Sequence, residues 1–246
     1  IIGGYYNQDP VVIHYDLRER KTKVLPGIFG NKTELVQVKV DRDLIKVLLT
    51  TRSLDNSNTL ALKTYDSDGN YLDSYIFNPA EDVGLNFGRV TNIGTNGSLI
   101  CGTYGARKSE YSRGLFIAQH TSEIEQEMRY FNYADLDNFF SYMKAKRQKR
   151  ISEKIDRKKV SGKKIKFNYR LLVHDILEYD DGYIMLGEAF YPKYNGYSNY
   201  NSYNGYGSND FSSRDYLPTT FSGYHYTHAV VIGFNTKGEV LWDNSF

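Results

Sequence analysis

The sequence DDGYIMLG at residues 180–187 and the sequence NTKGEVLW at residues 235–242 decide the fold of this chain. Each places a polar turn with a glycine directly before a short run of apolar and aromatic residues. Turns of this kind between apolar runs are among the strongest local signals of a β-hairpin. We therefore expect antiparallel strands joined by tight turns in this part of the chain.

The apolar run of the first stretch recurs along the chain. The shared pattern is two apolar residues, any residue, a glycine, any residue and an aromatic residue, and it occurs at residues 1–6, 99–104 and, with one extra residue, 184–190. A fourth copy, LIKVLLT at residues 44–50, lacks the glycine. We expect the glycine where neighbouring backbones crowd together near a central channel.

Each copy is followed by a strand, a turn and another strand, and three copies are also preceded by a strand. The preceding strands are predicted at residues 34–40, 86–92 and 169–177. Four short antiparallel strands per repeat, connected as a meander, are typical of a propeller blade. We therefore predict an all-β fold, a β-propeller of about four four-stranded blades, of which the first lacks its first strand. Residues 1–246 would form a single propeller domain or a fragment of a larger one; the alternative is a β-sandwich with ordinary hairpins.

The two stretches quoted first resemble the repeats of bacterial envelope propellers, especially those of Bacteroidota. In that family a strand similar to Asp-Gly-Gly-Tyr-Ile is followed by a turn and strand of the form Asn/Asp-x-x-Gly-x-Ile/Val-Leu-Trp. The match is good in the last repeat, whereas residues 66–72 keep the turn without the tryptophan, and roughly half the chain is covered. The resemblance implies a propeller in the periplasm, at the outer membrane or on the cell surface, associated with an outer-membrane or secretion complex.

The composition of the chain is compatible with one β-rich unit that has a sizeable core. Of its 246 residues 40% are hydrophobic, 23 are Tyr, and the formal net charge is +2, which by itself does not indicate nucleic-acid binding. Cys101 is the single cysteine, so we expect a small buried side chain rather than a disulfide. No run approaches the ~20 apolar residues that a membrane helix needs, so no transmembrane segment is predicted. The chain begins inside a strand pattern and stops on residues 242–246, and we expect both ends to be cut from a longer protein.

A basic insertion at residues 134–166 departs from the repeat. Asp135 is predicted to cap a helix that carries Phe139 and Met143. Residues 144–166 hold twelve Lys or Arg against Glu153 and Asp156, a net charge of +10, while the 19 basic and 27 acidic residues elsewhere give −8.

The basic helix either packs on the propeller rim as a solvated element, or docks on an acidic protein surface or an anionic membrane. Nucleic acid is not expected, because no stacking aromatics alternate with the basic residues. The candidate partner-binding cations are Lys144, Arg147, Arg150 and Lys158.

A second insertion, at residues 191–226, is rich in Tyr, Asn, Ser and Gly. Its period of three would place the rings on one face of an extended, polyproline-like segment. Two interpretations stay open: the rings pack along the propeller, or they contact a partner, since this composition is typical of adaptable binding loops. The candidate partner-binding residues here are Tyr191, Tyr194, Tyr197, Tyr200, Tyr203 and Tyr206.

No group of residues predicts a catalytic centre, a cofactor site or a metal site. His225 and His228 lie close in sequence, with Asp210 and Asp215 nearby, but a His-x-x-His pair alone does not make a metal site. Residues 66–70 resemble the start of a calcium loop, yet Phe77 stands where glutamate is required. No nucleophile elbow, phosphate-binding loop or His-Glu-x-x-His motif occurs.

We therefore predict a non-enzymatic binding or scaffolding module of a bacterial cell-envelope assembly, with another protein as its partner and without a cofactor. Two alternatives stay open. One is a propeller that binds glycans or the cell wall and uses exposed tyrosines as sugar platforms. The other is a domain of a hydrolase whose catalytic residues converge from separate blades.

Overall fold

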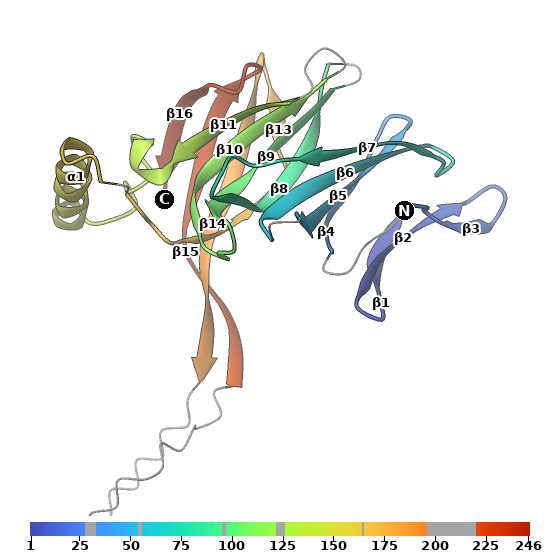
Figure 1. The fold of residues 1–246 in the computed structure, drawn as a ribbon, viewed down its shortest axis with the longest axis horizontal. Helices are drawn as coiled ribbons and strands as arrows, with labels where there is room; N and C mark the ends of the chain where they lie inside the picture. The colour runs from blue at the N-terminus through green and yellow to red at the C-terminus, as the bar shows by residue number, and fades with distance from the viewer. Residues whose placement is uncertain (28–32, 54–55, 95–96, 122–125, 164, 196–219) are drawn as a thin grey trace, which may run out of the picture.

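A computed structural model describes residues 1–27, 33–53, 56–94, 97–121, 126–163, 165–195 and 220–246 (Figure 1). The chain is built mainly from antiparallel strands, which confirms the prediction of an all-β fold class. Its described strands form four sheets that follow one another in chain order.

The sheets consist of strands that are close neighbours in sequence. The first contains β1 (Ile2–Tyr6), β2 (Asp9–Asp16) and β3 (Lys21–Val24). The second contains β4 (Glu34–Asp41), β5 (Leu44–Arg52), β6 (Asn58–Asp66) and β7 (Tyr71–Phe77). The third contains β8 (Val83–Ile93), β9 (Gly97–Ala106), β10 (Ser112–His120) and β11 (Glu127–Asn132). The fourth contains β12 (Arg170–Val173), β13 (Leu177–Tyr179), β14 (Gly182–Asn195), β15 (Thr220–Asn235) and β16 (Val240–Ser245).

The predicted strands and turns agree closely with these elements. The turn at residues 66–69 joins β6 to β7, and the turn at residues 235–238 joins β15 to β16. The first sheet has three strands, as the shortened first repeat predicts. The strand predicted at residues 169–177 is divided into β12 and the start of β13, and both pair with β14.

Apolar side chains fill the space between successive sheets. Alternate residues of one strand point to opposite faces, so a strand inside a stack of sheets contributes to two cores. In β9, Leu99 and Cys101 belong to the core shared with the fourth sheet, whereas Ile100 belongs to the core shared with the second. A third core, which includes Val12 and Ile45, lies between the first and second sheets. The second and third sheets are therefore buried on both faces.

The first strands of the later sheets also carry polar links between sheets. Arg89 of β8 donates from Nη1 to the Val36 oxygen of β4 at 2.8 Å and from Nε to the Val173 oxygen of β12 at 3.1 Å. Gln37 of β4 accepts the Val90 backbone N–H at 2.8 Å. These bonds hold β4, β8 and β12 beside one another, so three successive sheets meet along these strands.

Gly102 of β9 shows the close approach of backbones expected for the repeated glycine. A Cβ atom added there would lie 2.0 Å from the Phe87 oxygen and 2.8 Å from the Gly88 Cα atom of β8. Backbone atoms in a paired strand cannot move away cheaply, so this position requires glycine.

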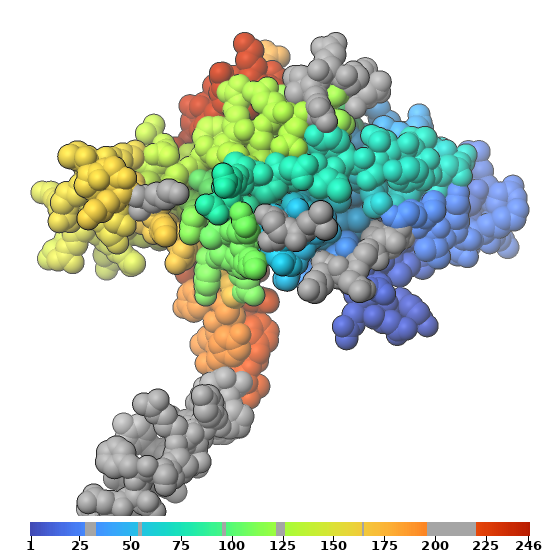
Figure 2. Space-filling view, viewed as in Figure 1, coloured from blue at the N-terminus to red at the C-terminus, as the bar shows by residue number. Residues whose placement is uncertain are grey.

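Two features project from the stacked sheets. The ends of β14 and β15 extend beyond the body as a two-stranded arm (Figures 1 and 2). Helix α1 (Ala145–Val160) lies at the edge of the molecule far from the first sheet (Figure 1). None of the helices in the described ranges has both the length and the apolar character that crossing a membrane requires.

Candidate functional site

Helix α1 forms about half of the predicted basic insertion at residues 134–166, and it begins ten residues after Asp135. Asp135 instead ends the short helix η1 (Tyr133–Asp135), and it forms an ion pair with Lys159 at 3.0 Å. Lys144 is the N-cap residue of α1 and provides no side-chain cap. The prediction that Asp135 caps the long helix was therefore wrong.

Burial of aromatic residues explains the late start of the helix. Tyr133 and Phe139 are fully buried in the core between the third and fourth sheets, where their rings stack with centroids 4.2 Å apart. The backbone N–H groups of Asp137 and Asn138 donate to the Asp243 carboxylate of β16, at 2.9 and 2.8 Å. These contacts hold the segment before α1 in an irregular conformation, because tertiary packing outweighs helix propensity.

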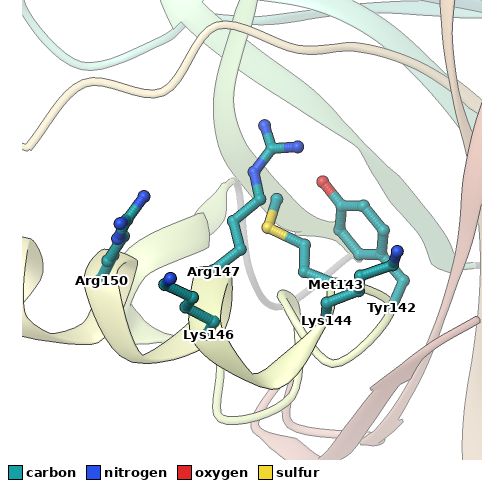
Figure 3. A pocket seen from close by; sticks show the side chains of 6 residues that line it. All are labelled: Tyr142, Met143, Lys144, Lys146, Arg147 and Arg150. Atoms are coloured by element: carbon teal, nitrogen blue, oxygen red, sulfur yellow. The ribbon is translucent and has the colours of Figure 1, made fainter.

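A concavity of about 680 Å³ lies at the beginning of α1 (Figure 3). Its lining residues come from the helix and the segment before it: Tyr142, Met143, Lys144, Lys146, Arg147 and Arg150. Figure 3 shows the Arg147 guanidinium and the Tyr142 hydroxyl on the same side of the Met143 side chain. The concavity thus combines an apolar and aromatic floor with four cationic side chains.

The four cations of the concavity are not neutralised within the chain as described. All four side chains are exposed, and no carboxylate in the described ranges forms an ion pair with Lys144, Lys146, Arg147 or Arg150. By contrast, Lys159 near the other end of α1 pairs with Asp135. An uncompensated group of this kind creates a positive potential that attracts anions.

The position of these cations at the helix N-terminus strengthens that potential. The first turn of α1 contains no acidic residue, although the partial positive charge of a helix N-terminus normally favours acidic side chains there. Lys144, Lys146 and Arg147 add positive charge to the positive end of the helix dipole. This arrangement works against the stability of the helix, and local rules are commonly broken in this way at functional sites.

The floor of the concavity is held in a fixed position. The Tyr142 ring stacks on the His228 ring of β15, with centroids 3.7 Å apart and planes inclined by 4°. The Tyr142 hydroxyl lies 3.4 Å from the Tyr169 hydroxyl, and the Tyr142 backbone N–H donates to Ser245 Oγ at 3.2 Å. Burial lowers the pKa of His228 to about 4, so its ring is neutral at pH 7 and the stack carries no charge.

The structure brings three of the four predicted cations together. Lys144, Arg147 and Arg150 line the concavity, whereas Lys158 lies toward the opposite end of α1 and does not line it. Tyr142, Met143 and Lys146 are lining residues that the sequence did not single out. No local signal marks Tyr142, because its role depends on contact with His228, which is distant in sequence.

The predicted tyrosines are only partly described. Tyr191 and Tyr194 lie on the β14 side of the arm with exposed fractions of 49% and 55%, and their rings contact His225 and Phe221 of the facing strand. Residues 191–195 are therefore a β-strand rather than a polyproline-like segment. Tyr197, Tyr200, Tyr203 and Tyr206 lie outside the described residues.

The two histidines considered as a metal site contact different side chains. His225 is exposed and contacts Tyr191, while His228 is buried against Tyr142. Asp210 and Asp215 lie outside the described residues. Among the residues whose positions are described, no group of three or more His, Cys, Asp or Glu is arranged to hold a metal ion. Cys101 is buried in the core, and burial raises the pKa of its thiol.

The concavity at α1 is thus the place where an aromatic floor and uncompensated cations coincide. Comparison with protein-family models, curated proteins and solved structures gave no significant match to this chain.

Proposed function

We propose that this chain is a non-catalytic binding module, built from an open series of propeller-like blades, that docks an acidic segment of a protein partner at the concavity of α1. The four exposed cations of that concavity, which lack an internal counter-charge in the described ranges, are the observation that carries the proposal. The sequential antiparallel sheets of three to five strands, packed face to face through successive cores, support the blade interpretation.

The shape of the site favours a protein segment over a membrane surface. A helix that binds in a membrane interface presents apolar side chains outward. In α1 Ile155 is 8% exposed and Ile151 is half-buried, so Val160 in the last turn, 90% exposed, is the one large apolar side chain of the helix that faces outward. Met143 and Tyr142 instead offer an apolar recess that would accept one aromatic or aliphatic side chain between flanking carboxylates.

The same geometry argues against nucleic acid as the partner. Proteins that bind single strands alternate cations with exposed aromatic platforms, on which bases stack. One face of the Tyr142 ring is already stacked on His228, and among the described residues no second aromatic side chain lines the concavity to continue a stack of bases. The location of the protein in the bacterial envelope remains a prediction that rests on the sequence resemblance.

A binding titration tests the proposal. The probe is a fluorescein-labelled peptide with one Phe flanked by Glu and Asp, and a peptide with Lys in place of the acidic residues serves as its control. We expect the acidic peptide to bind with an affinity that falls as salt concentration rises, and the triple variant Lys144→Gln/Arg147→Gln/Arg150→Gln to lose about tenfold or more in affinity.

The matched control removes the same charge elsewhere. Arg18, Arg42 and Lys237 are exposed residues of other turns, and their triple change to Gln should leave the affinity within about twofold of wild type. Equal losses in the two triple variants would show that only net charge matters and would overturn the proposal. Stronger binding to phosphatidylglycerol vesicles or to single-stranded DNA than to the acidic peptide would also overturn it.

A further inference from the structure

A second, smaller pocket lies between the third and fourth sheets, at the base of the arm. Its volume is about 340 Å³, at the small end of the range of about 300–1,000 Å³ typical of ligand pockets. Strands β8, β9, β10, β12, β14 and β15 contribute to its walls, together with Glu110 of the segment between β9 and β10. None of its lining residues belongs to the concavity at α1.

Two residues that line this pocket carry polar atoms with unused hydrogen-bonding capacity. The carboxamide oxygen and nitrogen of Asn86 are shielded from water, and neither has a hydrogen-bond partner among the described residues. The Nε atom of Arg170 is likewise shielded and without a partner there. A shielded polar group without a partner lowers the stability of the folded chain by about 1–3 kcal/mol. Three such groups at one pocket therefore reduce the folding stability substantially.

The local backbone explains why Asn86 is placed in this position. The pairing of β8 with β9 shifts between Leu85 and Phe87, so Asn86 is the extra residue of a β-bulge. Bulges redirect a side chain and are frequent beside binding sites. Asn86 is therefore released from the regular ladder at the edge of the pocket, with its carboxamide nitrogen beside Gly105 of β9.

The charged residues of the pocket balance each other. Arg170 forms an ion pair with Glu110, with Nη2 and Oε2 2.5 Å apart, and its guanidinium lies over the Tyr111 ring at 5.1 Å from the centroid. This pair leaves the pocket with no net charge from its lining residues while retaining donors on Arg170 and acceptors on Glu110. Such a site suits a neutral ligand that has several groups able both to donate and to accept.

An aromatic wall completes the pocket. Phe190 and Tyr224 lie on facing strands of the arm with ring centroids 5.2 Å apart and planes inclined by 86°, and Tyr224 is 57% exposed. Aromatic rings offer a flat apolar surface with polar groups at the rim. The apolar face of a pyranose ring would lie against the exposed Tyr224 ring, while its hydroxyls reach Arg170 and Glu110 directly and Asn86 after rotation of its carboxamide.

We propose that this pocket binds a neutral sugar residue of a glycan. A sugar hydroxyl supplies both a donor and an acceptor, which is what the Asn86 carboxamide lacks, and it would meet the carboxamide once that shielded group rotates toward the pocket. The size of the pocket corresponds to one or two sugar rings, so the contact would be with a short part of a longer glycan. This binding is independent of the acidic-segment site at α1, since the two sites share no residue.

Saturation-transfer NMR with a panel of neutral glycosides tests the proposal. The probes are methyl β-D-glucoside, methyl β-D-galactoside, methyl α-D-mannoside and N-acetylglucosamine, each at millimolar concentration. We expect at least one of them to receive saturation through its ring protons. Tyr224→Ala should weaken its affinity about tenfold, whereas Tyr191→Ala on the same arm but outside the pocket should leave it unchanged.

Asn86→Ala separates a binding role from a structural one. If Asn86 serves the ligand, this variant loses the affinity for the glycoside but unfolds at the same temperature as wild type or a higher one, because it removes unpartnered groups. A variant that binds as wild type does, or that loses stability, would overturn the assignment. So would the absence of saturation transfer from the protein to every glycoside, or a preference for free glutamine over all of them.

Discussion

The imidazole of His228 stacks on the phenol ring of Tyr142, with ring centroids 3.7 Å apart and ring planes inclined by 4°. This contact joins the arm-bearing strand β15 to the segment that leads into α1. It therefore connects the floor of the cationic concavity with the core of the fourth sheet. Loss of the stack would displace Tyr142 and, with it, the cations that follow.

Acidification should weaken this connection. The pKa of His228 is lowered by burial from 6.5 to about 4 in the folded chain, so between these values the unfolded chain binds more protons. Stability must then rise with pH across this window and fall as the pH drops from 6.5 toward 4, by about 3 kcal/mol at most.

Urea unfolding at a series of pH values measures how steeply the unfolding free energy depends on pH. His228→Phe retains the stacking and removes the titration, so it should flatten that slope; a variant with the wild-type slope would show that other groups cause it. His225→Phe, which keeps His228, is the matched control.

Because Lys46 is buried, we expect the stability of the chain to depend on pH in the alkaline range. Its ammonium group, 3% exposed, donates to Asn92 Oδ1 at 2.5 Å and to Ser98 Oγ at 2.9 Å, and thereby links the second sheet to the third. Burial lowers its pKa from 10.5 to about 8, so between these values the unfolded chain binds the extra proton and stability rises with pH. We expect the difference in unfolding free energy between wild type and Lys46→Met to change by about 1.4 kcal/mol per pH unit in that window. Lys63→Met, on the neighbouring strand, is the control; a constant difference across the window would contradict the prediction.

Gly102 should tolerate no side chain. Gly102→Ala places a methyl group 2.0 Å from the Phe87 oxygen, and we expect a loss of about 2 kcal/mol or more in the unfolding free energy. Gly4, in the corresponding repeat, has no atom within 4 Å of an added Cβ, so Gly4→Ala should change the unfolding free energy by less than about 0.5 kcal/mol. Chemical denaturation of the two variants makes the comparison. Similar losses in both would show that the crowding at Gly102 is not what limits the position.

We expect Asp243 to hold in place the segment that leads into the concavity, although Asp243 does not itself line it. Its carboxylate accepts the backbone N–H groups of Asp137 and Asn138, and Asp243→Asn loses one of these two acceptors. We expect a loss of about 1–3 kcal/mol in stability and a weaker affinity for the acidic peptide without a change in its salt dependence. Removal of the cations, in contrast, should reduce the salt dependence itself. An Asp243→Asn variant with wild-type affinity and stability would show that the segment is held by other contacts.

The local signals of the sequence predicted the strands well. Asp66–Gly69 and Asn235–Gly238 lie between strand-forming apolar runs, and the hairpins at these turns follow from local geometry. The repeated glycine predicted a crowded backbone, which the structure shows at Gly102 but not at Gly4, where an added Cβ would have no atom of the described residues within 4 Å. The excess of basic residues at 144–166 identified the helix that carries the candidate site.

Tertiary contacts decided the rest. The start of α1 depends on the burial of Phe139 and on the Asp243 carboxylate, which lies about a hundred residues further along the chain, so the Asp135 cap expected from local rules is absent. The pocket lined by Asn86 and Arg170 lies where a bulge in β8 of the third sheet meets β12 of the fourth sheet. The sequence by itself determined the strands, the turns and the charge of α1, since these depend on neighbours in the chain. The tertiary structure decided which cations meet and what lies beneath them, because those contacts join residues that only packing brings together.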